Sequence, residues 1–244
     1  MGCCLLLAGA SAAHAGAPLI VDDSGVHAPK EVEADFTVDG YRDKGSESSD
    51  GNLTLTTGLT TWLEGSMILG YGGQRERNQP GPADERDGFL DVTLGLKVPL
   101  LDSAKSPIGL ALSSAAVLPA AGHDLGVDRT NLNLLVIATR DWNDRFSTDV
   151  NAGFNWATGN GVAADAEDAT FFGVAARWTV AKPWMLFVET YAWLPAHAAG
   201  DAQQILRGGV QWQCSEKCSL SAALATGYGE TQRAGVSLGV NLVF

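Results

Sequence analysis

Apolar and polar residues alternate along much of the chain with a period of two. In the last segment, apolar residues stand at every second position from Ala234 to Leu242, and Gly, Ser or Asn fill most positions between them. Successive side chains of a β-strand point to opposite faces, so the pattern predicts a strand with one apolar and one polar or small face. Similar segments recur roughly every 20 residues, which predicts about twelve strands.

Strands that are half apolar and even in number are typical of one membrane fold. We expect an all-β structure, a transmembrane antiparallel up-and-down β-barrel of about 12 strands. The final strand ends on Phe244 and resembles the closing strand and assembly signal of bacterial outer-membrane barrels. The expected location is therefore the bacterial outer membrane. The expected partners are the barrel assembly machinery, outer-membrane lipids and lipopolysaccharide.

Composition agrees with this fold and excludes other classes. Hydrophobic residues make up 45% of the chain and the mean hydropathy is +0.03, which is too polar for a helical membrane protein. A barrel can have such averages because its strands carry apolar residues on one face only. The net charge of -12 makes nucleic acid an unexpected partner.

The N-terminus predicts export and a three-part organisation. Residues 1–15 have an apolar core and end in an A-x-A cleavage site, as a signal peptide does. We expect an N-terminal periplasmic arm or partial plug over 16–30, and the transmembrane barrel over 31–244. Cleavage leaves Cys214 and Cys218, which could close a hairpin disulfide in an oxidising compartment, with two free thiols as the alternative.

The connections between segments alternate in length, as they do in barrels with short periplasmic turns and longer outer loops. Five Trp residues lie near segment ends beside the short turns, where an aromatic girdle would lie. The short connections are expected near 63–64, 101–106, 141–145, 181–183 and 214–218. The longer ones are expected at 42–52, 73–88, 119–129, 157–168, 195–203 and 227–233. The five tryptophans are Trp62, Trp142, Trp178, Trp184 and Trp212.

The opposite face of the predicted strands is polar and mostly acidic, and it would line the lumen. Reflecting neighbouring strands about their loops predicts that Glu189 faces Arg207 and that Asp149 faces Arg177. The set could form a charged constriction that selects solutes, or it could fill the interior and hold the barrel shape. The predicted lumen residues are Glu31, Glu33, Asp35, Asp39, Asp91, Lys97, Asp149, Arg177, Glu189 and Arg207.

Catalysis is not expected. The sequence has no G-x-S-x-G motif, phosphate-cradling loop or metal-ligand cluster, and His27, His123 and His197 fall in the arm and loops. We expect no enzyme, no cofactor and no bound metal. The chain is also too short for the 16–18 strands of a porin. A surface lipid-modifying enzyme that uses His123 remains the least favoured alternative.

The segment Pro18-Leu19-Ile20-Val21-Asp22-Asp23-Ser24-Gly25 resembles the opening of one family of outer-membrane barrels. That family is catalogued under the meta-pathway of phenol degradation, or simply as transporters. Similar residues occur at Leu186–Glu189, at 208–210 and in the final strand. The resemblance covers nearly the whole mature chain, and it implies the uptake or passage of small molecules, aromatic ones among them.

Together these features predict a narrow passive channel for small solutes. The alternative is a filled, non-conducting barrel that supports the envelope. Asp22 and Asp23 of the arm are expected to contact Arg207 or Lys97, because basic residues are few in the lumen. An open acidic lumen would favour cations.

Overall fold

The computed structural model describes residues 19–43, 45–76, 85–120, 125, 130–157, 168–196, 202–228 and 233–244. These residues form one antiparallel sheet, and among them no helix is long and apolar enough to cross a membrane. The strands are β1 (Val32–Asp43), β2 (Ser46–Thr60), β3 (Leu63–Glu76), β4 (Glu85–Phe89), β5 (Val92–Leu101), β6 (Gly109–Leu118), β7 (Asn131–Asn143), β8 (Phe146–Ala157), β9 (Ala169–Ala181), β10 (Trp184–Pro195), β11 (Gln203–Ser215), β12 (Cys218–Gly227) and β13 (Arg233–Val243).

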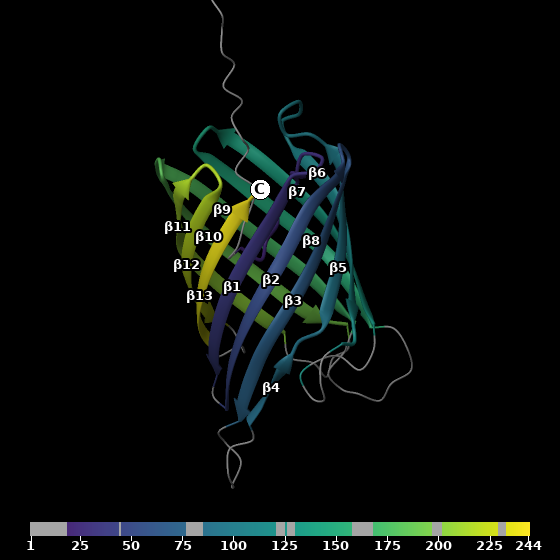
Figure 1. Cartoon of the computed structure of the whole chain (residues 1–244), viewed down its shortest axis with the longest axis vertical. Coiled ribbons are helices and arrows are strands. Elements are labelled where there is room, and N and C mark those ends of the chain that lie inside the picture. Colours follow the sequence, from purple (N-terminus) through teal and green to yellow (C-terminus); the bar gives the residue numbers. More distant parts are fainter. Residues whose placement is uncertain are drawn as a thin grey trace, which may run out of the picture.

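The sheet closes on itself because the first and last strands pair. β1 hydrogen-bonds to β13 from Glu33↔Val243 to Asp43↔Arg233, and in Figure 1 it lies between β13 and β2. β4 and β5 act as one interrupted strand, because both pair with β3 on either side of a break at residues 90–91. The result is a barrel of twelve strands, as predicted.

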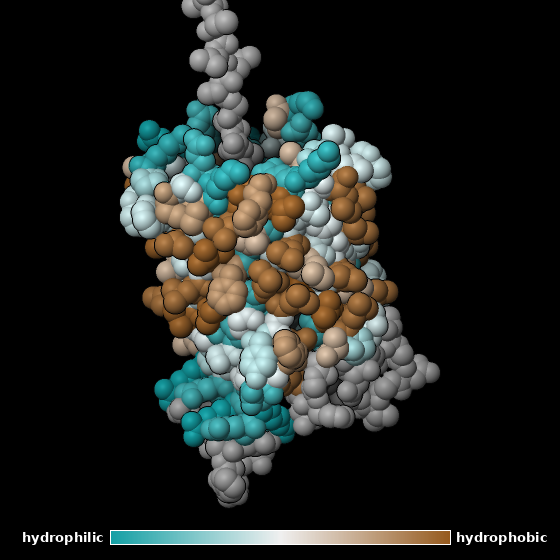
Figure 2. Space-filling view, in the orientation of Figure 1, coloured by the Kyte–Doolittle hydropathy of each residue, from teal (hydrophilic) through white to brown (hydrophobic). Residues whose placement is uncertain are grey.

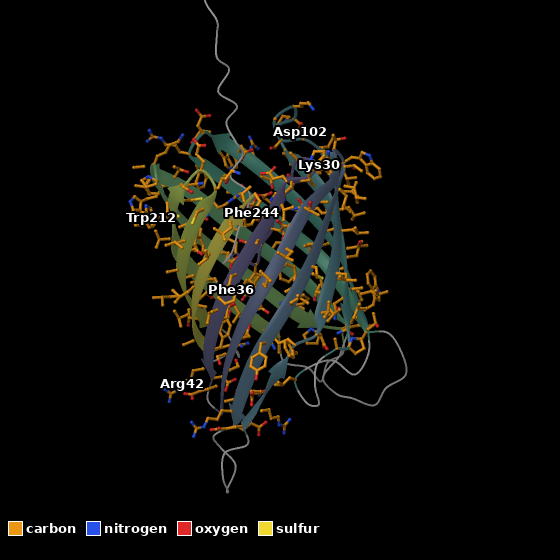
Figure 3. The ribbon with its side chains drawn as sticks, in the orientation of Figure 1. Lys30, Phe36, Arg42, Asp102, Trp212 and Phe244 are labelled. Carbon is orange, nitrogen blue, oxygen red and sulfur yellow. The ribbon has the colours of Figure 1, made fainter. Side chains whose placement is uncertain are left out.

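The two ends of the barrel differ. At the end that we name the turn end, β1 starts, β13 ends, and adjacent strands are joined by connections such as 144–145 and 182–183. At the opposite loop end most connections are longer, for example between β8 and β9. Figure 3 shows Lys30 and Asp102 at the turn end with Phe244, and Arg42 at the loop end. This asymmetry agrees with the predicted topology.

An apolar belt crosses the middle of the barrel on the face that Figure 2 shows, and exposed apolar side chains occur on strands all around the barrel. Large apolar side chains such as Phe36, Val136 and Leu238 are about half exposed there, because the residues at alternate positions point away from the lumen. Such a belt matches the hydrocarbon layer of a bilayer. All five girdle tryptophans are exposed beside the turn end, which confirms the predicted girdle on this side.

Two predicted loops were wrong. In the expected loop 73–88, residues 73–76 belong to β3 and residues 85–88 to β4, and these two strands pair with each other. Residues 42–52 belong largely to β1 and β2, which meet across 44–45, with Arg42 opposite Glu47 and Asp39 opposite Asp50. The polar residues around Ser49 suggested a loop because they lack an apolar face. Beyond the belt both faces of a strand meet polar surroundings, so the ladder continues without apolar side chains.

Candidate functional site: the lumen and its N-terminal segment

The lumen wall carries buried ion pairs between neighbouring strands. Glu189 of β10 lies directly opposite Arg207 of β11, as predicted, and Glu189 Oε1 is 3.5 Å from Arg207 Nη1. Asp39 of β1 also approaches Arg207, with 3.7 Å between its Oδ1 and Nη2, and Tyr41 shares a hydrogen bond with the same nitrogen. The side chains of Glu189 and Arg207 are 0% and 2% exposed. These opposite charges stabilise one another where water is restricted.

The second predicted pair forms, but in a different register. Ser147, rather than Asp149, lies opposite Arg177, and Asp149 lies opposite Ala175. Arg177 reaches Asp149 diagonally, with its Nε 3.1 Å from Oδ2 and its Nη2 donating to Oδ1 over 3.2 Å. A diagonal neighbour on the same face lies within reach of a long side chain.

Not every predicted lumen residue lies within the barrel. Glu31 precedes β1 at the turn end, and its Oε2 accepts an exposed hydrogen bond from the backbone N–H of Ala28. Asp91 lies in the break between β4 and β5, where it accepts an exposed hydrogen bond from Ala120. Both belong to the rims, because the regular alternation that places side chains in the lumen stops at strand ends. The predicted residues buried inside are Glu33, Asp35, Lys97, Asp149, Arg177, Glu189 and Arg207.

The chain before β1 lies inside the barrel. The Glu189 carboxylate accepts hydrogen bonds from the backbone N–H groups of Ile20 and Val21, both at 2.9 Å from Oε2. Asn151 of β8 accepts from the N–H of Asp22 and donates to its carbonyl oxygen, each at 2.8 Å. Wall side chains therefore satisfy the backbone of this segment as a neighbouring strand would.

Two carboxylates of the segment meet the lumen cations. Asp22 Oδ2 is 3.1 Å from Lys97 Nζ, which also contacts Glu64 at 3.3 Å. Asp23 Oδ2 is 3.1 Å from Arg177 Nη1. The predicted contact with Lys97 therefore forms through Asp22. Asp23 meets Arg177 instead of the predicted Arg207, which contacts the wall residues Asp39, Tyr41 and Glu189.

Apolar residues of the segment pack against one side of the lumen. Val21 is fully buried in a cluster with Phe171, Tyr191 and Ile205 of strands β9 to β11. Gly173 makes room for it, because a Cβ atom there would lie 2.7 Å from Val21 Cγ2. The lumen wall of β9 to β11 thus carries an apolar aromatic cluster beside its buried charges.

His27 anchors the segment close to the start of β1. Its Nδ1 is 2.7 Å from Glu64 Oε2 and its Nε2 is 3.2 Å from Glu33 Oε2. Burial by itself would lower the pKa of His27, but the hydrogen bonds and charges of the two carboxylates outweigh it and raise the pKa to about 10. His27 is therefore an imidazolium held between two acids at neutral pH.

The next residues bind the wall through their backbone. Pro29 forms a parallel bridge with Gly58 of β2, and the N–H of Lys30 donates to the Gly58 carbonyl over 3.0 Å. A Cβ at Gly58 would lie 2.3 Å from the Ala28 carbonyl oxygen, so the approach requires glycine. Lys30 has a φ of 72°, where the chain turns into β1.

The sequence did not identify His27, Asn151 and Thr139 as lumen contacts. Thr139 Oγ1 accepts from the N–H of Ser24 and donates to Asp149, both at 2.8 Å. His27 belongs to the segment, and Asn151 and Thr139 bind the backbone of the segment. All three residues therefore help to hold the segment in the lumen. The alternation in β7 and β8 could have placed Thr139 and Asn151 on the inner face, but it could not show what they bind.

The structure says less about the predicted roles of the cysteines and of the other histidines. Cys214 and Cys218 are free thiols in the structure, with 2.6 Å between their sulfur atoms at the turn end, so the disulfide stays a prediction. His123, His197 and the signal peptide over 1–15 lie outside the described residues. Among the described residues, no group of three or more His, Cys, Asp or Glu could hold a metal ion.

Comparisons with known proteins agree with this architecture. Residues 22–242 match the model of a family described as "Putative MetA-pathway of phenol degradation". The COG4313 outer membrane channel from Pseudomonas putida F1 is similar in structure, with a TM-score of 0.74 and 14% identity, over 91% of this chain and 98% of that one. No curated protein is significantly similar.

Two porins show the same fold at greater distance. The NanC porin has a TM-score of 0.63 and 9% identity, over 85% of this chain and 98% of its own. The KdgM porin in complex with disordered oligogalacturonate has a TM-score of 0.60 and 6% identity, over 86% and 99%. At these identities the likeness shows the fold, which is that of an outer-membrane β-barrel.

Proposed function

The chain belongs to the family described as "Putative MetA-pathway of phenol degradation", and from that premise we propose that it is a narrow passive channel for small solutes, aromatic ones among them. Its fold resembles that of an outer membrane channel and of porins. The solute would move along the lumen, past the buried ion pairs of the wall and the aromatic side chains of β9 and β10. Outer-membrane lipids would contact the apolar belt, and lipopolysaccharide the loop end.

One observation carries this proposal. Much of the material inside the barrel comes from a separate segment, residues 19–28, which the wall holds by side-chain contacts. Val21, Asp23 and His27 of this segment are 0%, 4% and 4% exposed. Residues 19–24 lie outside the strand ladder and can leave the lumen without breaking a strand pair, whereas Pro29 and Lys30 bond to Gly58 of β2. The proposed role of residues 16–30 is therefore a partial plug, of which residues 19–24 can leave the lumen.

A filled, structural barrel is the competing function, and the same burial favours it. If the segment never leaves, the wall pairs and the segment together form a solid interior that supports the envelope. The two functions differ in one respect, which is whether solutes cross when the segment is free to move. Permeation through a reconstituted bilayer therefore separates them.

The sharpest test locks the segment to the wall reversibly. The side chain of Ser24 points at Gly109 of β6, where its Oγ lies within bonding reach of the position that a Cβ atom would take, so the pair Ser24→Cys and Gly109→Cys can be oxidised to a bridge, with Cys214 and Cys218 both replaced by Ser. We expect vesicles with the oxidised protein to exclude small sugars and benzoate, and reduction to restore their entry. Equal permeation in both redox states would contradict a plug role. The matched control is Ser24→Cys alone, which should not respond to reduction.

Catalysis has little support in this arrangement. The buried acids and bases of the lumen are paired with one another, with the segment or with wall amides, as Asp35 is with Asn241 at 2.7 Å. Activation of a nucleophile needs a base within hydrogen-bond reach of it. We propose passage and not turnover, so a solute recovered from vesicles should be chemically unchanged.

A further inference from the structure

The N-terminal segment has the chemical form of a small amphipathic acid. Leu19, Ile20 and Val21 give it an apolar stretch, and Asp22 and Asp23 follow directly with two carboxylates. The lumen receives these two parts at two different places. What surrounds each part indicates which other molecule could take its place.

The carboxylate part lies between two cations that come from different strands. Lys97 of β5 and Arg177 of β9 are 10% and 6% exposed in their side chains. Lys97 contacts one wall acid, Glu64, and one segment acid, Asp22. Arg177 likewise contacts Asp149 of the wall and Asp23 of the segment, each at 3.1 Å. Each buried cation therefore faces a carboxylate that departs with the segment.

The apolar part of the segment fills a space on the lumen wall that is open because Gly173 has no side chain. We call this space the niche. Val21 lies over Gly173, with Phe171 and Tyr191 beside it. The rings of Phe171 and Tyr191 are 6.2 Å apart at the centroids, and Trp193 lies 4.7 Å from Phe171. Aromatic walls with a small gap between them suit a compact apolar group.

We infer that the lumen binds small molecules that join a carboxylate to an apolar body, at the position that Val21 to Asp23 now hold. The ligand carboxylate takes the place of Asp22 or Asp23 beside Lys97 and Arg177, and the body enters the niche over Gly173. This inference rests on the proposed function, because the segment must move for a solute to enter. The segment and the solute compete for one site.

Charge balance makes this site selective within an acidic lumen. Acids such as Asp35 and Asp39 repel a free anion elsewhere along the wall. At this position the segment already contributes two carboxylates, so exchange for a monocarboxylate makes the interior less negative. A neutral analogue has the body but cannot meet the two cations, and acetate has the charge but cannot fill the niche. Aromatic and aliphatic acids share the chemistry and differ only in the shape of the body.

The test uses a full-length variant in which the segment binds the lumen wall more weakly. In Asp22→Asn/Asp23→Asn, titration calorimetry in detergent compares benzoate, hexanoate, benzamide and acetate. We expect benzoate or hexanoate to bind roughly tenfold or more tightly than benzamide and acetate, and more tightly than to the wild-type protein. Benzoate against hexanoate then identifies the shape of the body. The control Asp50→Asn, a lumen-side acid not in contact with the segment, should not raise affinity.

Two further variants on that background locate the site. Arg177→Gln should remove the preference for benzoate over benzamide, and Gly173→Ala should weaken both by filling the niche. Lys97→Gln replaces Arg177→Gln if the latter does not fold, as judged by heat-modifiable migration on gels. Equal affinity for benzoate and benzamide, or affinity unchanged in Gly173→Ala, would overturn the inference.

The inference about binding and the proposed channel function can be contradicted independently of each other. If sugars cross vesicles but no acid binds, the inference is wrong and the channel stands. If acids bind with the stated preference but nothing crosses in any variant, the site is real and the proposed channel is wrong.

Discussion

The two parts of the N-terminal segment are held in different ways. The tip, residues 19–24, is held mainly by side chains of five strands, from Lys97 on β5 to Glu189 on β10. The base, residues 27–31, is held by strands β1 to β3 through His27 and through backbone bonds to Gly58. The tip meets charges that a solute could also meet, whereas the base continues directly into the wall. The difference suggests that the tip leaves first and that the base stays.

The largest effect is expected from Glu189→Gln, which removes a contact between the wall and residues 19–24, the tip of the segment. It removes the acid that pairs with Arg207 and the carboxylate that receives two backbone N–H groups. Breaking a buried ion pair from one side costs about 3–5 kcal/mol. We expect a lower free energy of unfolding in vesicles, measured by guanidinium titration with tryptophan fluorescence, and higher solute permeation. An unchanged permeation rate would show that Glu189 serves the wall alone.

A smaller effect is expected from His27→Gln, which removes a contact between the wall and residues 27–31, the base of the segment. The loss of hydrogen bonds to two carboxylates costs about 1.5–3 kcal/mol. The raised pKa of His27, about 10 against a usual value of 6.5, gives this contact its pH dependence. Its stabilisation is complete below pH 6.5 and declines as pH rises through about 10.

Channel conductance from pH 6 to pH 11 checks this dependence. The acids that face His27 are Glu33 of β1 and Glu64 of β3, and Lys97 of β5 lies beside Glu64. We expect wild-type conductance to stay level below about pH 6.5, to increase as the pH rises further, and to level off above about pH 10. His27→Gln should lack this increase, and an increase that survives in His27→Gln belongs to another group.

Asp22→Asn tests the tip more gently. Its side chain is 37% exposed and pairs with Lys97, so solvent screening limits the loss to about 1 kcal/mol. We expect a faster opening of the tip, seen as more frequent conductance events, with the unfolding curve almost unmoved. If the unfolding curve shifts as far as in Glu189→Gln, the tip and the wall form one unit.

The smallest effect is expected outside the lumen. Arg42 and Glu47 form an ion pair at 3.5 Å with side chains 67% and 31% exposed, and such pairs are worth about 0–1 kcal/mol. Arg42→Ala should change neither unfolding nor permeation within error. A clear permeation change there would move attention from the segment to the loop end.

The outer face and the lumen differ in how far the sequence predicts them. Hydrocarbon requires an apolar residue at every second outward position, so the strands, their number and the girdle followed from periodicity. The Glu189–Arg207 pair followed because its loop was centred correctly. For Asp149 and Arg177 the assumed centre of the loop between β8 and β9 was one residue too far along the chain. The predicted partner of Asp149 was therefore Arg177, two residues beyond the true partner Ala175.

The contacts of the segment could not follow from periodicity. His27 meets Glu33 and Glu64 because β1 and β3 flank the point where the chain enters the barrel. Asn151 and Thr139 look like ordinary inward polar residues in the sequence, and only the path of residues 19–24 gives them partners. The break at residues 90–91 likewise has no signal in an alternation that continues across it.

Planar-bilayer conductance of a protein that lacks residues 19–26 is the most direct test of the segment's role. The deletion keeps His27 and the contacts of the base, so the wall should assemble as before. The account predicts a steady conductance with cation preference, set by the remaining wall acids, where the wild type opens rarely. A deleted protein that is folded and still as silent as the wild type would contradict it.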